Sequence, residues 1–151
     1  MINIKKRYSY VIEYFQKHRP IAESELKYTD PYELLVAVIL SAQCTDKRVN
    51  MVTPILFEKY PNPKALSIAS QEEGYKIIKS ISYPNNKANN LVLMANKLVK
   101  DYNSEVPDDI NELQKLNGVG RKTANVITSV LFNQPNMPVD THVFRVSWRI
   151  G

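Results

Sequence analysis

The chain has 151 residues, enough for one domain with a buried core or for one domain and part of another. Its 20 lysines and arginines exceed its 15 acidic residues, and the resulting formal charge of +5 favours a polyanionic partner such as nucleic acid. The single cysteine, Cys44, excludes an internal disulfide framework and any cysteine-built zinc or iron–sulfur site within these residues, and it fits a reducing, cytoplasmic setting.

Nearly every segment of the chain predicts an α-helix. An amphipathic helix with apolar residues at i, i+3, i+4 and i+7 comes first and ends before Pro20. A second helix begins at the N-cap Asp30 and is apolar on all sides over residues 34–40, so its neighbours must bury it. That apolar run is too short to span a bilayer, so we expect no membrane partner. A third helix over residues 46–60 contains Pro54, which must kink or divide it.

The middle of the chain continues with capped helices. A short helix is expected over residues 62–69, and Ser70 with Glu73 forms a capping box for a helix over residues 71–81. After the turn "SYPNN" a longer helix follows, and its buried face is expected to hold Leu91, Met94, Ala95, Leu98 and Tyr102.

Two helices then flank a pair of glycines. Asp108 or Asp109 caps the first of them, and Asp140 caps a final helix near the end of the chain. We find no convincing strand, repeat or low-complexity linker, so the predicted fold class is all-α. The helix after the glycines is expected to direct four side chains inward: Ala124, Ile127, Val130 and Leu131.

The stretch "LNGVGRKTANV", residues 116–126, resembles the start of several phosphate-binding loops. A Walker loop requires a lysine directly after its second glycine, but Arg121 stands there. A dinucleotide fingerprint requires a third glycine where Thr123 stands, and it requires a buried strand before the motif. What remains is a tight hairpin between two helices, in which Gly118 and Gly120 allow a sharp turn and present backbone N–H groups to an anion.

Two residues near this hairpin can carry chemistry, and each also has a simpler role. Lys122 falls in the first turn of a helix, where the dipole disfavours an ammonium ion, so the residue is either a neutral-amine nucleophile or a phosphate contact. Asp140 is a natural N-cap, and a carboxylate held in that way can also stabilise a cationic sugar. His142 has no second metal ligand at a recognisable spacing, so we interpret it as a surface or packing residue.

The hairpin followed by "VDTHVFRV" resembles the helix-hairpin-helix and aspartate motifs of the endonuclease III family of DNA glycosylases. The stretches "LLVAVILSAQCTD" and "IIKSISYPNNKANNL" are similar to two more segments of that family, and the resemblance extends from about residue 4 to 151. It implies the helix-hairpin-helix DNA glycosylase fold. A six-helix domain is expected over residues 20–135, with the hairpin motif at about 109–132, and residues 1–19 and 136–151 are expected to be parts of a second helical domain.

The resemblance also implies an activity on duplex DNA with oxidised pyrimidines or abasic sites. The lysine that matches Lys122 attacks C1′ of the damaged nucleotide, and β-elimination then cuts the strand on its 3′ side. The aspartate that matches Asp140 assists. Gln43 is implied as the wedge that enters the duplex, with a second inserting residue near Tyr83. The expected contacts to DNA phosphates come from Lys87, Gly118, Gly120, Arg121 and Arg145.

One departure from the family concerns a cofactor. Family members normally continue to four cysteines that hold a [4Fe–4S] cluster, and those ligands are not among these residues, so we expect no cofactor in this chain. We therefore expect a truncated member, with apolar faces on its terminal helices that are uncovered and can favour self-association. The alternative to an active enzyme is a binding-only fragment that grips DNA weakly and shows little lyase activity.

Overall fold

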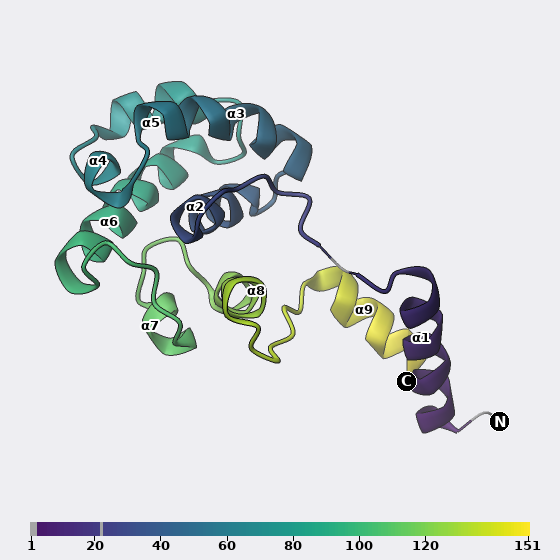
Figure 1. Cartoon of the computed structure of the whole chain (residues 1–151). Helices are drawn as coiled ribbons and strands as arrows, with labels where there is room; N and C mark the ends of the chain where they lie inside the picture. Colours follow the sequence, from purple (N-terminus) through teal and green to yellow (C-terminus); the bar gives the residue numbers. More distant parts are fainter. Residues whose placement is uncertain (1–2, 22) are drawn as a thin grey trace. The chain divides into compact units, whose positions relative to one another are not determined.

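A computed structural model describes residues 3–21 and 23–151 of the chain. The described residues form α-helices and no strand, which confirms the all-α prediction (Figure 1). None of the helices in these ranges is long and apolar enough to cross a membrane. In chain order the helices are α1 (Ile4–His18), α2 (Pro31–Ser41), α3 (Asp46–Lys59), α4 (Pro63–Ser67), α5 (Gln71–Ile78), α6 (Pro84–Asp101), α7 (Ile110–Gln114), α8 (Arg121–Phe132) and α9 (Thr141–Ile150).

The chain divides into two compact units. Unit 1 comprises Met1–Ser24 and Val139–Gly151 and contains α1 and α9. Unit 2 comprises Glu25–Pro138 and contains α2 to α8. The hydrophobic core of the described residues lies entirely in unit 2.

The core of unit 2 is built around α2. Asp30 caps this helix by accepting a hydrogen bond from the backbone N–H of Glu33 at 2.8 Å, and Pro31 occupies its first turn. Every residue from 34 to 40 is buried, as the uniformly apolar pattern predicts. Helices α3, α6 and α8 all contact α2. The most buried segment of the sequence therefore becomes the central helix of the unit.

Two details bear on the sequence-based expectations for α3 and α8. Helix α3 continues through Pro54, so it is not divided there, and residues on both sides of the proline, such as Val49 and Leu56, are buried in the core. In α8, Val130 is 37% exposed, whereas Thr128 is fully buried. The Thr128 hydroxyl donates to the Ala124 carbonyl at 2.9 Å, so its polar group is satisfied and its methyl group can join the core.

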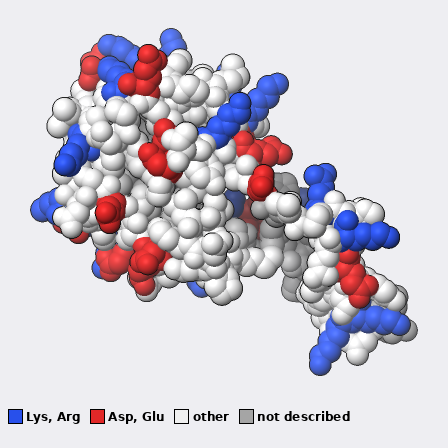
Figure 2. Space-filling view, viewed as in Figure 1, with Lys and Arg blue, Asp and Glu red and all other residues white. Residues whose placement is uncertain are grey.

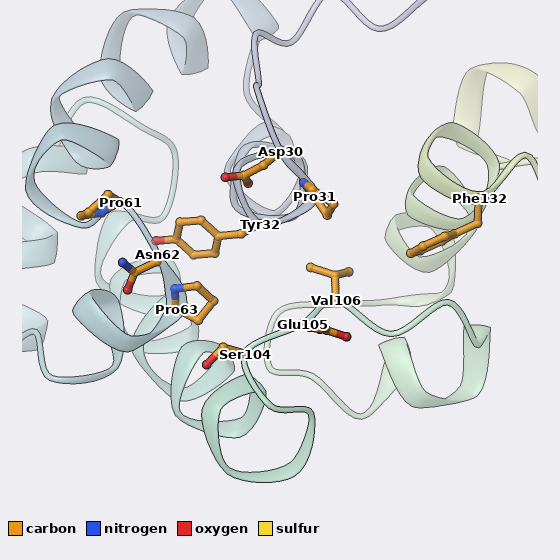
Figure 3. Close-up of a pocket in the computed structure, with 10 residues that line it drawn as sticks. All are labelled: Asp30, Pro31, Tyr32, Pro61, Asn62, Pro63, Ser104, Glu105, Val106 and Phe132. Carbon is orange, nitrogen blue, oxygen red and sulfur yellow. The ribbon is translucent and has the colours of Figure 1, made fainter.

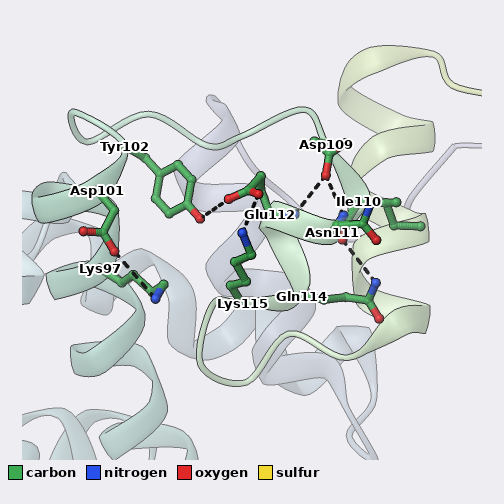
Figure 4. A network of polar contacts seen from close by, with 9 residues as sticks. All are labelled: Lys97, Asp101, Tyr102, Asp109, Ile110, Asn111, Glu112, Gln114 and Lys115. Carbon is green, nitrogen blue, oxygen red and sulfur yellow. Dashed lines mark hydrogen bonds and ion pairs between the residues drawn. The ribbon is translucent and has the colours of Figure 1, made fainter.

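A polar network joins the end of α6 to α7 (Figure 4). The Tyr102 hydroxyl donates to one oxygen of Glu112 at 2.8 Å, and the Lys115 ammonium donates to the other oxygen at 2.6 Å. The hydrogen bond from Lys115, followed by that from Tyr102, lowers the pKa of the Glu112 carboxyl. Burial, with the bond to Glu112, raises the pKa of Tyr102 to about 12. Because α7 is the first helix of the glycine hairpin, this network helps to anchor the hairpin.

We expect Glu112→Gln to lower the melting temperature slightly at pH 7 and to have less effect in acid. The folded state holds Glu112 with a depressed pKa, so the stability that its charge contributes is present above the ordinary carboxyl pKa. That contribution disappears as the pH falls through the folded-state pKa. Thermal unfolding between pH 7 and pH 3 tests this, with Glu72→Gln in the exposed Glu72–Lys76 pair as the control. A Glu112→Gln effect that stays constant down to pH 3 would contradict the assignment.

Unit 1 is a pair of helices with exposed apolar side chains. Helices α1 and α9 contact each other, and an Arg7 guanidinium nitrogen donates to the Ile150 carbonyl at 3.0 Å. No side chain of either helix is buried, and Phe144 and Trp148 are 68% and 80% exposed. This agrees with the expectation that these faces are uncovered. Self-association through them stays a prediction.

Candidate active site

The glycine hairpin connects α7 to α8 and packs closely on two other helices. Gly118 has a φ of +79°, and a β-carbon added there would lie 3.2 Å from the Ile39 side chain of α2 and 3.3 Å from the Asn90 side chain of α6. This position therefore requires glycine both for its backbone conformation and for space. Gly120 is the N-cap of α8 and has open space beside it, and no side chain caps the first turn. An anion can therefore approach the positive end of α8.

Lys122 is the second residue of α8 and its side chain is exposed in the described structure. It interacts electrostatically with Asp46, the first residue of α3. Partial burial raises the pKa of the Asp46 carboxyl, Glu25 raises it further, and Lys122 acts in the opposite direction. Asp46 therefore lies within electrostatic range of the Lys122 side chain.

Asp46 is not among the site residues expected from the sequence. In the structure Thr45 is the N-cap of α3, accepting a hydrogen bond from the backbone N–H of Arg48 at 3.3 Å. The position of Asp46, only three residues after Gln43 in the stretch "SAQCTD", was the available signal. Its interaction with Lys122 depends on tertiary packing in unit 2, where α3 and α8 both contact α2, and local sequence does not reveal this packing.

Gln43 and Tyr83 lie on two loops of unit 2 and share an unusual backbone conformation. Gln43 follows the end of α2 with a φ of 54°, and Tyr83 precedes α6 with a φ of 53°. A positive φ is uncommon outside glycine and is most unusual for a bulky residue such as tyrosine. Both side chains are exposed, Tyr83 by 63%. Each is therefore presented to solvent by a constrained turn.

The environment of Lys87 does not match that of a phosphate contact. Lys87 is only 7% exposed, although the sequence suggests a lysine reaching DNA from the surface. Its ammonium donates to the carbonyl oxygens of Leu40 and Ala42 and to the hydroxyl of Ser82. A direct contact to DNA would require these bonds to break. We therefore leave Lys87 out of the DNA contacts that we propose.

Three other predicted site residues occupy helix starts or surfaces. Arg121 is the exposed first residue of α8 in unit 2. In unit 1, Asp140 caps α9 by accepting a hydrogen bond from the backbone N–H of Val143 at 2.8 Å, which confirms its capping role. Arg145 is also exposed, and one of its guanidinium nitrogens lies 3.3 Å from Nδ1 of His142.

A hollow of about 400 Å³ in unit 2 lies between α2, α4 and the segment after α6 (Figure 3). None of the residues that line it is a predicted site residue; they are Asp30, Pro31, Tyr32, Pro61, Asn62, Pro63, Ser104, Glu105, Val106 and Phe132. In the face seen in Figure 2, basic and acidic side chains of unit 2 are interspersed and do not form one basic patch. The hairpin and the two constrained loops remain the candidate site features of unit 2.

The residues of this chain do not fit a [4Fe–4S] cluster. Such a cluster is held by four cysteines, and the sequence has one. Cys44 is partly buried against the core of unit 2. Across residues 3–21 and 23–151, no group of three or more histidine, cysteine or acidic side chains could hold a metal ion.

The glycine hairpin lies in a region that matches a known protein family. Residues 36–151 match the model of the HhH-GPD superfamily of base excision DNA repair proteins. The chain belongs to this family. The matched region begins inside α2 and includes the glycine hairpin, Lys122 and Asp140. The predicted resemblance to endonuclease III is confirmed by curated relatives of that name.

Two of these relatives are close in sequence. Endonuclease III of Rickettsia prowazekii is 49% identical over 141 residues, which cover 93% of this chain and 66% of that protein. Endonuclease III of Bacillus subtilis is 48% identical over 151 residues, which cover all of this chain and 68% of that protein. The chain thus spans about two thirds of the length of these relatives.

Solved structures in the family share the fold. A trapped covalent intermediate of endonuclease III with DNA, in an estranged-adenine complex, is 48% identical, matches with a TM-score of 0.91, and covers 97% of this chain and 68% of that chain. A thermostable thymine-DNA glycosylase is 28% identical, with a TM-score of 0.81, over 94% of this chain and 66% of that chain. These matches confirm the helix-hairpin-helix glycosylase fold.

Proposed function

We propose that the protein carrying this chain is a bifunctional DNA N-glycosylase and abasic-site lyase of base excision repair, acting on oxidised pyrimidines in duplex DNA. The observation that carries the proposal is the close match to endonuclease III, including a structure trapped covalently on DNA, together with a lysine at the start of α8. Lysine is one of the residues that forms Schiff bases with carbonyl carbons.

The proposed reaction begins at the Lys122 amine. Its nitrogen bonds to C1′ of the damaged nucleotide, the bond from C1′ to the base breaks, and the base leaves with that electron pair. The C1′–O4′ bond then breaks with its electron pair going to O4′, which opens the sugar and gives a Schiff base between Lys122 and C1′. In the β-elimination a base removes a proton from C2′, and the C–O bond on the 3′ side breaks with its electron pair leaving on the phosphate. We assign to Asp140 the stabilisation of the cationic sugar or the activation of the amine. Asp46, which interacts with Lys122, is suited to accept a proton from the attacking amine.

The proposed DNA contacts follow the geometry of unit 2. Backbone amides near Gly118 and Gly120 bind a phosphate at the positive end of α8, and the exposed Arg121 adds a cation there. Gln43 and Tyr83 enter the base stack and fill the gap left by the extruded nucleotide. Arg145 of α9 is proposed as a further phosphate contact, as the sequence resemblance implies.

We also propose a domain organisation. The six-helix domain that carries the hairpin spans about residues 20–135, and residues 1–19 and 136–151 form part of a second helical domain. Unit 2, Glu25–Pro138, overlaps most of the first range, although its described residues form seven helices, α2 to α8, and not six.

Cleavage of defined duplexes tests the proposed function. We expect the protein to release the base from a thymine-glycol duplex and to cut an abasic duplex, leaving an undamaged duplex of the same sequence intact. A binding-only protein would shift all of these duplexes in a gel and cut none of them. The match to endonuclease III favours the enzyme over that alternative. Binding without cleavage would overturn the proposal.

Arg121→Gln should weaken DNA binding without abolishing it. Loss of one phosphate contact is expected to reduce the slope of the logarithm of the binding constant against the logarithm of the salt concentration by about one. It should weaken binding to all duplexes to a similar extent. Fluorescence anisotropy at several salt concentrations measures both quantities. Lys64→Gln removes an equal charge from the exposed surface of α4 and should leave the slope unchanged. An unchanged slope in Arg121→Gln would remove Arg121 from the interface.

A further inference from the structure

The buried ammonium of Lys87 connects two loops of unit 2. Its Nζ donates to the Leu40 carbonyl at 2.8 Å, to the Ala42 carbonyl at 2.6 Å and to the Ser82 hydroxyl at 3.1 Å. A lysine ammonium has three donors, so these three bonds use all of them. Two of the acceptors belong to the C-terminal end of α2, and the third belongs to the turn before α6.

These bonds form a closed arrangement. The Ser82 hydroxyl, which accepts from Lys87, also donates to the Ala42 carbonyl at 3.3 Å. The Lys87 ammonium, the Ala42 carbonyl and the Ser82 hydroxyl are therefore all hydrogen-bonded to one another. Gln43 comes directly after Ala42, and Tyr83 comes directly after Ser82. The cluster thus fixes the backbone immediately before each of the two residues that we propose enter DNA.

The conformations of Gln43 and Tyr83 show why such fixing is needed. Each has a φ close to +50°, which for non-glycine residues persists only where the surroundings enforce it. The backbone N–H of Lys87 also donates to the Tyr83 carbonyl at 3.1 Å, so Lys87 holds this turn from both its main chain and its side chain. Both inserting side chains remain exposed while their backbones are constrained.

The electrostatics favour an internal role for Lys87. A cation is stabilised at the C-terminal end of a helix, where the carbonyl groups of α2 point toward it. Burial lowers the pKa of the Lys87 ammonium, and Cys44 acts in the opposite direction. In the structure the ammonium donates to three neutral oxygens. The arrangement serves to hold carbonyl and hydroxyl groups of the protein in place.

We propose that Lys87, with Ser82, is a positioning residue that holds Gln43 and Tyr83 at a fixed separation so that the two side chains enter the duplex together. The inference rests on the proposed function, in which these side chains fill the gap left by the extruded base. Lys87 acts through the two loops and makes no contact with DNA. Its loss impairs extrusion of the nucleotide, and the chemistry at C1′ is left intact.

Two variants test this role. Lys87→Met keeps much of the apolar stem and removes the three bonds, whereas Ser82→Ala removes only the link between the loops. We expect each to slow single-turnover base release from a thymine-glycol duplex, Lys87→Met by about tenfold or more. The fluorescence rise of 2-aminopurine placed opposite the lesion should decrease in parallel. Cleavage of an abasic single strand, which has no stack to open, should stay within about twofold of wild type.

A double-mutant cycle separates positioning from general stability. If Lys87 acts through the inserting residues, Lys87→Met should add little to the defect of a Gln43→Ala, Tyr83→Ala variant. Lys97→Met changes another lysine of α6, one paired with Asp101, and serves as the matched control. Melting curves identify variants that do not fold. If Lys87→Met is one of these, Ser82→Ala is used in the cycle.

The outcomes distinguish the inference from the proposed function. If the wild-type protein neither releases the base nor raises the fluorescence, the proposed function fails, and the inference fails with it. If the wild type does both and the variants match it, or if their defects add fully to those of Gln43→Ala and Tyr83→Ala, only the inference fails. An equal loss on the abasic single strand would also overturn it, because that result indicates a general effect on the protein.

Discussion

Replacing Lys122 with glutamine is expected to abolish strand cleavage and the formation of a covalent adduct with abasic DNA under borohydride. Glutamine has good helix propensity and keeps a polar side chain on α8, so the hairpin should fold unchanged. Its amide nitrogen cannot form a Schiff base, so the rate should fall by at least about a thousandfold. Binding to abasic DNA should remain measurable, because the backbone amides of the hairpin are still present.

The control for Lys122→Gln is Lys64→Gln. Lys64 occupies the second position of α4, as Lys122 occupies the second position of α8, and it is exposed. This control variant should trap and cleave like the wild type. Normal trapping by Lys122→Gln would remove Lys122 from the role of nucleophile and leave it as a phosphate contact.

Asp140→Asn should separate the two roles assigned to that residue. Asparagine is as good an N-cap as aspartate, so α9 should keep its first turn and the melting temperature should change little. The carboxylate charge is lost, and turnover should fall by roughly two orders of magnitude, the usual scale for a removed electrostatic group. Single-turnover cleavage and thermal unfolding of the same preparation measure the two effects.

The control for Asp140→Asn is Asp30→Asn. Asp30 also caps a helix through one backbone N–H, at the same distance of 2.8 Å, but belongs to none of the sites proposed for DNA. Both variants should retain their helices, and only Asp140→Asn should lose activity. If Asp140→Asn cleaves DNA as well as the wild type does, Asp140 is only a helix cap.

Features that depend on neighbouring residues in the sequence could be predicted well. The caps at Asp30, Ser70 and Asp140 each use a side chain and an N–H group within three residues, so the local sequence is sufficient. The burial of α2 follows from its uniformly apolar composition. The glycine hairpin follows from residue types that suit a tight turn before a helix.

Features that depend on packing between distant segments could not be predicted. The Lys87 ammonium donates a hydrogen bond to the Leu40 carbonyl at the end of α2, 47 residues earlier in the chain. Nothing in the sequence around Lys87 marks it as buried. The interaction of Asp46 with Lys122 likewise joins α3 to α8. Val130 was predicted to point inward but is partly exposed, because the buried face of α8 includes Thr128. The Thr128 hydroxyl is hydrogen-bonded within the helix, which allows this polar residue to be buried.

The most direct test of the central claim is to identify the residue that becomes attached to DNA. The protein is incubated with an abasic duplex and borohydride, the adduct is digested, and the modified peptide is sequenced by mass spectrometry. We predict that the modification lies on the side-chain nitrogen of Lys122, at the start of α8. Attachment through another lysine or through the α-amino group, with Lys122 unmodified, would contradict the account.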